Sequence, residues 1–508
     1  MPINTLRAEG AACFVCGFPR IMQRPEVKYT QLFINNEFVN SKSGKTFEVQ
    51  DPATQEIICR VQEGDAADID LAVKAAAKAF EVDSVWRTMD ASKRGRLLYE
   101  LADLIEKNAG YIAHLESLDV GKPVGDAKVD VAMAIKGARY FAGYADKTHG
   151  KVIPVDGNSI CWTRHEPVGV VAIITPWNFP FFLCMQKITA ALCVGCTVVA
   201  KPAENTPLTA IFLASLFQQV GFPPGVVNIV PGFGATAGAA LIRHPLVNSI
   251  SFTGSTAVGK FIQATAAETT KRVGLELGGK SALIIFADAD FEKAARTAHE
   301  TIMANAGQVC VGSSRAFVQD EIYDRMVQRL KELAEERRVG DPFDPATVQG
   351  PQVSQLQFDR VMKYIEMGRK EGARLVTGGE RVGDRGYFIQ PTVFADVTDD
   401  MTIAREEIFG PVQSILRFST LEEVIRRANS SDYGLGGGVF TSDMDKAMRV
   451  AQSLQAGCVW INSYMVVNIG APFGGFKRSG IGREMSKYAL EHLTEVKMVS
   501  MPISLKNS

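Results

Sequence analysis

The sequence lacks the features that mark several large classes of protein. Lys and Arg total 55 and Asp and Glu total 56 among 508 residues, so the net charge is close to zero. A protein whose main partner is nucleic acid needs a basic excess to neutralise phosphates, and none is present. The six histidines form no H-E-x-x-H pattern, so nothing indicates a metal-dependent hydrolase, and we expect no metal site.

Cysteine is too scarce for a secreted fold held together by disulfides. Nine cysteines are spread over the chain, an odd number without framework spacing. Cys13–Cys16 and Cys193–Cys196 have the C-x-x-C spacing, but neither has a second pair nearby at zinc-finger spacing. Cys193 and Cys196 lie in an apolar run, which favours small buried core residues.

An uninterrupted hydrophobic run of membrane-spanning character is also missing. The longest uncharged stretch, residues 167–186, contains Pro176 and Pro180, which favours a strand, a loop and the start of a helix. Residues 1–27 are expected to form an N-terminal extension without the apolar core of a secretory signal. We therefore expect a cytoplasmic protein, and the sequence leaves the mitochondrial matrix open as the alternative.

Regular alternation of strand-like and helix-like segments predicts an α/β fold. Because the strand-like segments are apolar without alternation, they indicate a parallel sheet covered on both faces, with ligands bound at the carboxyl ends of its strands. A second α/β pattern begins near Ser281 and continues to Gly475. Before the first sheet, residues 32–49 predict short strands around a Gly turn, and helices follow between residues 66 and 116. The five strand-like segments of the first sheet are 168–174, 197–201, 226–230, 249–254 and 271–277.

Two short motifs match nucleotide-binding patterns in an unsuitable setting. Residues 274–281, GLELGGKS, match G-x-x-x-x-G-K-[ST], but the run after Lys280 resembles a strand. A phosphate loop must open a helix, so a P-loop NTPase is the weaker alternative. Residues 232–237, GFGATA, match G-x-G-x-x-A after the third strand. Gly234 is therefore kept as a cofactor contact, with a Gly turn capping a helix as the alternative.

Three residues offer the parts for carbonyl chemistry through a thiol adduct. Cys310 lies among small residues in NAGQVCVGSSR, Glu276 ends a strand before two glycines, and Asn178 lies between prolines in PWNFP. They could supply a nucleophile, a base and a neutral hydrogen-bond donor. Taken singly, each has a structural alternative: a buried core cysteine, an ion-paired or N-capping carboxylate, and a loop-shaping asparagine.

The combination of these motifs resembles the NAD(P)-dependent aldehyde dehydrogenase superfamily over residues 28–505, most closely its class 1/2 branch, which includes retinal and acetaldehyde dehydrogenases. The motifs occur in the family's order, and their joint presence is far more specific than any one of them. They are TPWNFP (175–180), KPAENTP (201–207), FTGSTAVG (252–259), LELGGKS (275–281), NAGQVCVGSSR (305–315), EEIFGPV (406–412), WIN (460–462) and PFGGFKRSGIGRE (472–484).

The resemblance implies oxidation of an aldehyde to the carboxylic acid with NAD. By this likeness Cys310 attacks the aldehyde, Asn178 and the Cys310 backbone N–H form the oxyanion hole, and hydride passes to nicotinamide. Glu276 would activate the water that hydrolyses the thioester. Lys187 matches a lysine that relays protons in relatives, with an ordinary helix lysine as the alternative.

The resemblance also implies the cofactor contacts. Lys201 and Glu204 would hold the adenosine ribose, and a carboxylate there favours NAD over NADP because it repels a 2′-phosphate. Gly254 and Ser255 would meet the pyrophosphate at a helix N-terminus. Further contacts are expected from Thr175, Pro176, Trp177, Gly234, Gly259, Leu277, Gly278, Gln357, Arg360, Glu407 and Phe409.

The substrate channel is where the chain departs from the class 1/2 pattern. Relatives usually carry Trp at the position of Gln186 and Phe at the positions of Ala304 and Val467, and often an acidic residue at Met465. These departures predict a wider channel that accepts aldehydes larger than acetaldehyde. The alternative is that bulk from Phe181, Phe182 or Met465 compensates.

The family likeness implies two large domains and a small assembly element, through which relatives form dimers or tetramers. We expect no nucleic-acid or membrane partner. Two further alternatives remain. One is a CoA-acylating relative, which would have no use for the water-activating carboxylate of Glu276. The other is a catalytically silent structural member, which would not need to retain Cys310, Glu276 and Asn178. The expected units are 1–27 (extension), 28–144 with 167–277 (NAD-binding), 278–481 (catalytic), and 145–166 with 482–508 (oligomerisation).

Overall fold

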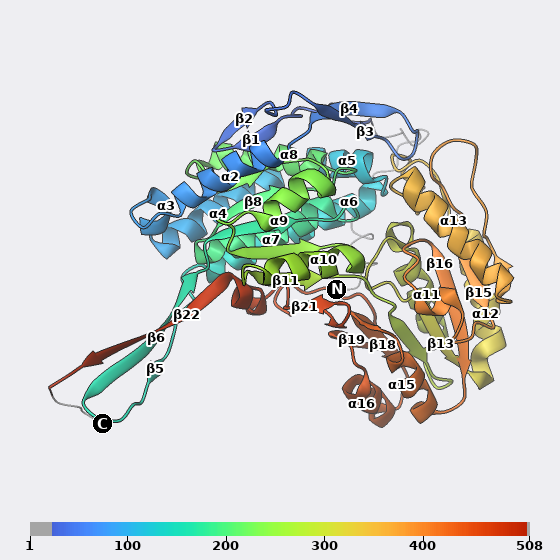
Figure 1. Ribbon diagram of the computed structural model, residues 1–508. Helices are drawn as coiled ribbons and strands as arrows, with labels where there is room; N and C mark the ends of the chain where they lie inside the picture. The colour runs from blue at the N-terminus through green and yellow to red at the C-terminus, as the bar shows by residue number, and fades with distance from the viewer. Residues whose placement is uncertain (1–22, 505–508) are drawn as a thin grey trace.

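A computed structural model describes residues 23–504 as a mixed α/β protein built around two sheets (Figure 1). Cys13, Cys16 and most of the expected extension at 1–27 lie outside the described residues. The two sheets lie side by side, with the earlier part of the chain around the first sheet and the later part around the second.

The first sheet has the strand order β2-β1-β9-β8-β7-β10-β11-β21, and its central strands run parallel. These central strands are the five that the sequence predicts, so the expected fold class is confirmed. The last strand, β21, comes from the far end of the chain and pairs antiparallel with β11. The strands are β1 (Leu32–Ile34), β2 (Glu37–Val39), β7 (Val170–Ile174), β8 (Thr197–Lys201), β9 (Val227–Ile229), β10 (Ser249–Thr253), β11 (Arg272–Glu276) and β21 (Gly480–Ile481).

Helices cover both faces of the first sheet, which explains why its strands are apolar without alternation. In β7, Val171 and Ile173 pack on one side with α4, α6, α7 and α8, whereas Val170 and Ala172 pack on the other with α2, α9 and α10. Cys193 and Cys196 lie in the first of these cores and are fully buried, as predicted. The helices are α2 (Ala66–Ala79), α3 (Val85–Thr88), α4 (Ala91–Lys107), α5 (Ala109–Val120), α6 (Val124–Tyr144), α7 (Pro180–Val194), α8 (Leu208–Val220), α9 (Ala239–Arg243) and α10 (Thr256–Ala267).

The second sheet has the order β14-β15-β16-β13-β12-β18-β19, parallel except for the β14–β15 pair at its edge. Its two faces are also covered by separate hydrophobic cores. The strands are β12 (Ala282–Ile285), β13 (Arg315–Gln319), β14 (Arg374–Thr377), β15 (Thr392–Ala395), β16 (Val412–Phe418), β18 (Gly436–Phe440) and β19 (Cys458–Ile461), and the small pair beside it is β17 (Tyr433–Gly434) with β20 (Phe476–Lys477). The helices are α11 (Phe291–Met303), α12 (Tyr323–Glu336), α13 (Gln355–Lys370), α14 (Thr402–Arg405), α15 (Leu421–Asn429) and α16 (Met444–Ser453).

The P-loop interpretation of residues 274–281 is wrong. Strand β12 follows Lys280 directly, so no helix N-terminus is available to bind a phosphate there. Lys280 is itself buried, and burial lowers its pKa to about 7. Gly234, from the second short motif, opens a π-helical turn (Gly234–Gly238) that leads into α9.

The Gly turn expected within residues 32–49 is present at Gly44, and a second turn without glycine precedes it. Asn35 and Asn36 connect β1 and β2 with φ values of 54° and 69°, a left-handed pair that matches the twist of a two-residue hairpin. Gly44 lies in the next connection, before the β3–β4 hairpin (Thr46–Gln50 and Ile57–Gln62). Asparagine tolerates this conformation better than most side chains, which is why the turn needs no glycine.

A long arm projects from the first unit (Figure 1). It consists of β5 (Val152–Ile153), β6 (Ser159–Pro167) and β22 (Thr494–Pro502), and β22 pairs with β6 over nine residues. Val496, Met498 and Met501 on β22 are exposed, as is Ile160 on β6. The arm therefore presents apolar side chains that no described residue covers.

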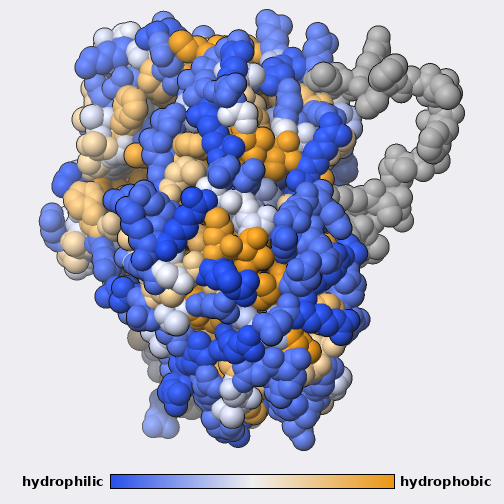
Figure 2. Space-filling model, turned by 90° about the vertical axis from the view of Figure 1, so that its right-hand side faces the viewer, coloured by the Kyte–Doolittle hydropathy of each residue, from blue (hydrophilic) through white to orange (hydrophobic). Residues whose placement is uncertain are grey.

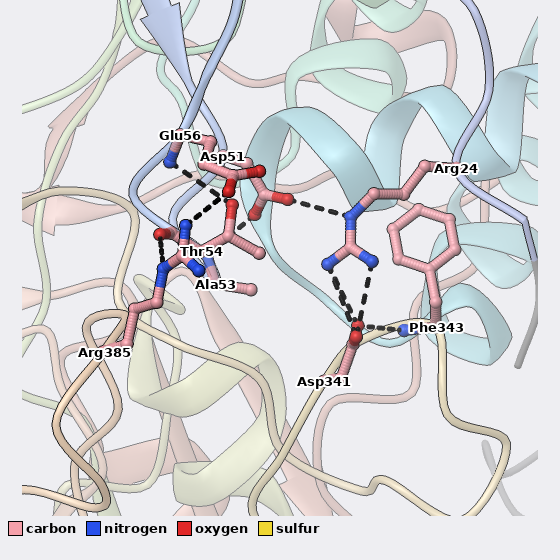
Figure 3. Close-up of polar contacts among 8 residues, drawn as sticks. All are labelled: Arg24, Asp51, Ala53, Thr54, Glu56, Asp341, Phe343 and Arg385. Carbon is pink, nitrogen blue, oxygen red and sulfur yellow. Dashed lines mark hydrogen bonds and ion pairs between the residues drawn. The ribbon is translucent and has the colours of Figure 1, made fainter.

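An arginine near the start of the described chain bridges the two units (Figure 3). The Arg24 guanidinium donates to Asp51 at 3.0 Å, on the β3–β4 hairpin, and to Asp341 at 3.4 Å, beyond α12. It also lies 4.9 Å from the centre of the Phe343 ring. On the other side of the hairpin, Arg385 binds the Glu56 carboxylate at 2.5 Å. These contacts help to set the orientation of the second sheet relative to the first.

The face that carries α12 and α13 is mainly hydrophilic, with hydrophobic surface concentrated across its middle (Figure 2). Within residues 23–504, no helix combines the length and apolar character that crossing a membrane requires.

Candidate active site

A cavity of about 430 Å³ lies where the carboxyl ends of β7, β10 and β11 meet the loop before β13. All the predicted catalytic residues and most of the predicted cofactor contacts line it. A larger surface hollow of about 650 Å³ lies beside α2 and α3 and contains none of them. The predicted residues that line the cavity are Pro176, Trp177, Asn178, Lys187, Gly254, Ser255, Glu276, Leu277, Gly278, Cys310, Gln357, Arg360, Glu407 and Phe409.

The Cys310 thiol and the Glu276 carboxylate face each other in this cavity. The distance from Cys310 Sγ to Glu276 Oε1 is 3.7 Å. Burial, together with the neighbouring carboxylates of Glu276 and Glu407, raises the pKa of the Cys310 thiol well above its usual value. The thiol is therefore protonated at neutral pH, and a neighbouring group must accept its proton before it can act as a nucleophile.

Glu276 has the properties of that acceptor. Burial raises its pKa to about 7, and the positive charge of Lys187 partly opposes this rise. Its second oxygen, Oε2, accepts a hydrogen bond from the Thr253 hydroxyl at 3.1 Å, which orients the carboxylate. A carboxyl group that titrates near 7 can take up and release a proton at neutral pH, as a general base requires.

Asn178 lies at the end of β7 with its amide directed toward the loop that carries Cys310. Its Nδ2 donates to the Gln308 carbonyl at 2.8 Å, and this is one of the two hydrogens on that nitrogen. The Cys310 backbone N–H has no acceptor among residues 23–504. A side-chain N–H and a backbone N–H are thus both available near the thiol for an oxygen that gains negative charge.

The loop before Cys310 has an unusual backbone. Asn305, Ala306 and Gly307 all have positive φ, at 46°, 55° and 77°. A Cβ on Gly307 would lie 1.9 Å from the Gly410 backbone, so only glycine fits there. Such strain persists only where surrounding contacts over-determine it. Here the Asn305 amide donates to the Asn178 carbonyl at 3.0 Å and Gln352 donates to the Ala306 carbonyl at 2.9 Å.

Lys187 is not a solvent-facing helix lysine. Its side chain is buried, and Nζ donates to Glu484 Oε1 at 2.7 Å and to the Ser251 hydroxyl at 3.0 Å. Glu484 lines the same cavity as Glu276. Glu484 was not among the residues predicted from the sequence, although it ends the PFGGFKRSGIGRE motif. Nothing in that motif indicated a partner for Lys187, because the two residues are 297 positions apart.

The helix after β10 offers a site for an anion. Ser255 caps α10 by accepting the Val258 N–H, and the other N–H groups of the first turn are unpaired by the helix itself. A Cβ on Gly259 would lie 2.4 Å from the Leu277 side chain, so glycine allows α10 to approach the end of β11. The free N–H groups and the helix dipole both favour a phosphate group at this point.

A separate cluster lies at the end of β8. Lys201 is buried, and its Nζ contacts the carbonyls of Pro202 and Gly232 and the Glu204 carboxylate at 3.4 Å. Glu204 is partly exposed, as is the turn that starts at Gly234. These residues are close together but lie outside the cavity that contains Cys310, as the far end of a long ligand would require.

The opposite wall of the cavity is a loop held by α13. Glu407 accepts a hydrogen bond from the Gly279 N–H at 2.9 Å, and a Cβ on Gly278 would lie 2.2 Å from the Glu407 carboxylate. Gln357 donates to the Phe409 carbonyl at 2.7 Å and Arg360 to the Glu407 carbonyl at 2.9 Å. The side chains expected to contact a ribose thus also anchor the loop.

The residues present fit an extended dinucleotide. The Phe409 and Trp177 rings form an edge-to-face pair, 5.3 Å apart, on the cavity wall. The Thr175 hydroxyl, at the end of β7, is buried and has no partner among the described residues. Together with the start of α10 and the Lys201 cluster, these groups follow the carboxyl edge of the first sheet, where dinucleotides bind in open parallel sheets.

The remaining cavity wall is mainly apolar. It includes Met133, Phe182, Met465, Val467 and Phe473. Phe181, which was expected as one source of compensating bulk, is instead buried in the core of the first unit. Phe182 and Met465 do line the cavity, so part of the expected compensation is present.

Comparison with known proteins agrees with this geometry. A sequence model described as "Aldehyde dehydrogenase family" matches residues 38–499. Mouse retinaldehyde dehydrogenase 3 is 55% identical, with 96% of each chain covered. Human retinal dehydrogenase 2 is also 55% identical, over 95% of this chain and 94% of that protein.

Solved structures give the same result for the fold. The NAD+ complex of an aldehyde dehydrogenase from Bacillus cereus is 49% identical, with a TM-score of 0.94 over 95% of this chain and 100% of that chain. Betaine aldehyde dehydrogenase from Staphylococcus aureus in complex with NAD+ is 39% identical, with a TM-score of 0.92 over 94% and 96% of the two chains.

The pairing of Cys310 with Glu276 predicts how thiol reactivity depends on pH. The rate of Cys310 alkylation by iodoacetamide should rise about tenfold from pH 6 to pH 8, because Glu276, with a pKa of about 7, accepts the thiol proton only when ionised. Glu276→Gln should lower the rate at both pH values and make it rise more steeply, about 100-fold over the same range, because the thiolate fraction of an unassisted thiol grows tenfold with each pH unit below its pKa. Mass spectrometry of the Cys310 peptide measures the rate separately from other thiols. Identical pH profiles in the two proteins would contradict the pairing.

Proposed function

Because this chain belongs to the aldehyde dehydrogenase family, we propose that Cys310 is its catalytic nucleophile and Glu276 its general base. The chain is an NAD-dependent oxidoreductase that converts an aldehyde to the carboxylic acid. The observation that carries the residue assignment is the 3.7 Å separation of the thiol and the carboxylate in a cavity that also contains the Asn178 amide.

The reaction begins when the Cys310 proton passes to Glu276. The sulfur then forms a bond to the carbonyl carbon, and the carbonyl π electrons move to the oxygen, which gives a tetrahedral thiohemiacetal. The Asn178 Nδ2 and the Cys310 backbone N–H donate to this oxygen. Donors of this kind are typically worth about 3–4 kcal/mol in the transition state.

NAD, when bound, supplies the hydride acceptor that turns the thiohemiacetal into a thioester. Once Glu276 has released the thiol proton, its carboxylate takes a proton from water, and the resulting hydroxide attacks the thioester carbon. The carbon–sulfur bond breaks, the carboxylic acid leaves, and Cys310 is regenerated. A single carboxyl group with a pKa near 7 serves both proton transfers.

Lys187 and Glu484 move protons away from Glu276 in this proposal. The ion pair at 2.7 Å lies beside Glu276, and the Lys187 charge lowers the pKa of the Glu276 carboxyl relative to burial alone. An ion pair with its own hydrogen bond to Ser251 can pass a proton without leaving a buried charge unpaired.

The cofactor assignment follows the carboxyl edge of the first sheet. Lys201 and Glu204 would bind the adenosine ribose, the start of α10 would bind the pyrophosphate, and Glu407 and Phe409 would hold the nicotinamide end. The Glu204 carboxylate would repel a 2′-phosphate, so we propose that NAD is preferred to NADP. The other predicted contacts remain part of this proposal, including Thr175, whose hydroxyl lacks a partner within residues 23–504.

We propose an assembly into dimers or tetramers through the arm formed by β5, β6 and β22. Its exposed Val496, Met498 and Met501 support this, because apolar side chains of this size are usually covered.

The cytoplasm remains the predicted compartment. The domain division is 28–144 with 167–277, 278–481, and 145–166 with 482–508. The two sheets support it, except that Gly480–Ile481 joins the first sheet.

The rival functions have less support. A CoA-acylating enzyme would not need a carboxylate beside the thiol to activate water, and Glu276 is present at 3.7 Å. A catalytically silent family member would not need to keep Cys310, Glu276 and Asn178 around one cavity.

Cys310→Ala is expected to lower the rate of aldehyde oxidation by more than about 10⁴-fold, because no other group can form the thiohemiacetal. NAD binding, measured by isothermal titration calorimetry, should persist. NADH absorbance measures turnover. Substantial turnover by this variant would rule out Cys310 as the nucleophile.

Glu276→Gln should separate the two halves of the reaction. A slowed burst of about one NADH per active site is expected at pH 9, because acylation can still occur, followed by a steady rate at least about 100-fold lower, because the base for hydrolysis is lost. Stopped-flow absorbance records both phases. If Glu276→Gln forms no burst of NADH although its Cys310 still reacts with iodoacetamide, a different group is the base.

The channel should favour aldehydes larger than acetaldehyde, since Ala304 and Val467 are small and Val467 lines the cavity. We expect kcat/KM for octanal to exceed that for acetaldehyde by about tenfold or more, because each additional buried methylene group adds binding free energy. The two values come from NADH formation at limiting substrate. A higher value for acetaldehyde would contradict the wider channel.

A further inference from the structure

A buried amide on the cavity wall has both of its polar atoms unpaired within the part of the chain that the structure describes. Gln186 lies on α7, lines the cavity and is only 3% exposed. On the same helix, Phe182 and Leu183 also line the cavity, one turn before Gln186. Gln186 thus continues a row of side chains that begins beside Asn178.

The charged groups beside Gln186 on this wall are paired. Asp130 accepts a hydrogen bond from Lys122 at 2.5 Å, and Lys187 binds Glu484 at 2.7 Å. By contrast, neither Nε2 nor Oε1 of Gln186 has a hydrogen-bond partner among the described residues. A buried amide normally has partners, because leaving both atoms unpaired costs the free energy of removing them from water.

Helix α6 makes room for this amide. A Cβ on Gly137 would lie 2.4 Å from Gln186 Nε2 and 3.1 Å from its Cδ. Glycine is unfavourable in the interior of a helix, and here it leaves the space that the amide occupies. Glutamine has three rotatable side-chain bonds, so its amide can turn from Gly137 toward the cavity without movement of the backbone.

The position of Gln186 sets where a partner would lie on a substrate. Six residues separate it from Pro180, the first residue of α7, which corresponds to about 9 Å along the helix. Pro180 follows Asn178 by two residues, and Asn178 contacts the Cys310 loop, so we take this length along α7 as the approximate separation between the formyl group and an oxygen that meets Gln186.

We propose that Gln186 is a specificity-determining residue that selects aldehydes with a hydroxyl or carbonyl oxygen several carbons from the formyl group. The inference rests on the proposed function, since it takes Cys310 as the point where the formyl carbon reacts. A carbonyl oxygen would accept a hydrogen bond from Nε2, and a hydroxyl could also donate to Oε1. An apolar chain at the same place would leave the amide unpaired.

The test compares octanal with 7-oxooctanal, which differ by one carbonyl oxygen near the predicted position. In the unaltered protein, kcat/KM for 7-oxooctanal should exceed that for octanal by about tenfold. Gln186→Met keeps the length of the side chain and removes its hydrogen bonds, so it should bring this ratio close to one. Met133→Leu is the matched control on the same wall, and should change both values by a similar factor.

Two outcomes would overturn the proposal: a ratio near one in the unaltered protein, or an unchanged high ratio in Gln186→Met. Propanal is too short to reach Gln186, and its oxidation by the unaltered protein and by Cys310→Ala reports the proposed function separately. Turnover of propanal by Cys310→Ala would overturn the proposed function. If Cys310→Ala is inactive but the ratio is near one in the unaltered protein, or stays high in Gln186→Met, the role of Gln186 is overturned and the proposed function stands.

Discussion

Two reciprocal hydrogen bonds join the two sheets at the point where the chemistry occurs. Asn178, at the end of β7, donates to the Gln308 carbonyl, and Asn305 donates to the Asn178 carbonyl. The second of these bonds holds a left-handed turn that would otherwise be strained. The first bond uses one of the two hydrogens on Asn178 Nδ2 and leaves the other free for the oxygen of the proposed thiohemiacetal. The contact between the two sheets and the proposed oxyanion site thus depend on one small set of amides.

Burial of charge is the second feature on which the site depends. Glu276 is 3% exposed, and removal from water raises its pKa into the range where it can exchange protons at neutral pH. Burial of such groups is unfavourable unless they are paired, and the neighbouring ions are paired: Lys187 with Glu484, and Lys122 with Asp130. The same exclusion of water gives the Glu276 carboxyl a pKa near 7 and leaves a mainly apolar wall for an aldehyde. Gln186, on the same wall, has neither amide atom paired among residues 23–504, and a ligand explains this better than the fold does.

Prediction from sequence succeeded where the signal was local. The five parallel strands were recognisable because their residues are apolar on both faces, and the structure packs those faces against separate cores. Lys280 was also interpreted correctly as preceding a strand. Long-range partners could not be predicted: Glu484 is 297 residues from Lys187, and Gln357 and Arg360 bind backbone carbonyls about 50 residues away. The turn at Gly44 could be predicted from its residue type, whereas the turn at Asn35 and Asn36 was not predicted.

By itself, the sequence determined the fold class and the kinds of chemical group available, because strand periodicity and ordered motifs are properties of neighbouring residues. It identified a thiol, a carboxylate and an amide suited to carbonyl chemistry. Only the tertiary structure decided that the thiol lies 3.7 Å from the carboxylate, that burial brings the pKa of the Glu276 carboxyl to about 7, and that Gln186 faces Gly137 without a hydrogen-bond partner. These properties arise from distance and exclusion of water between segments far apart in the chain, which no local pattern encodes.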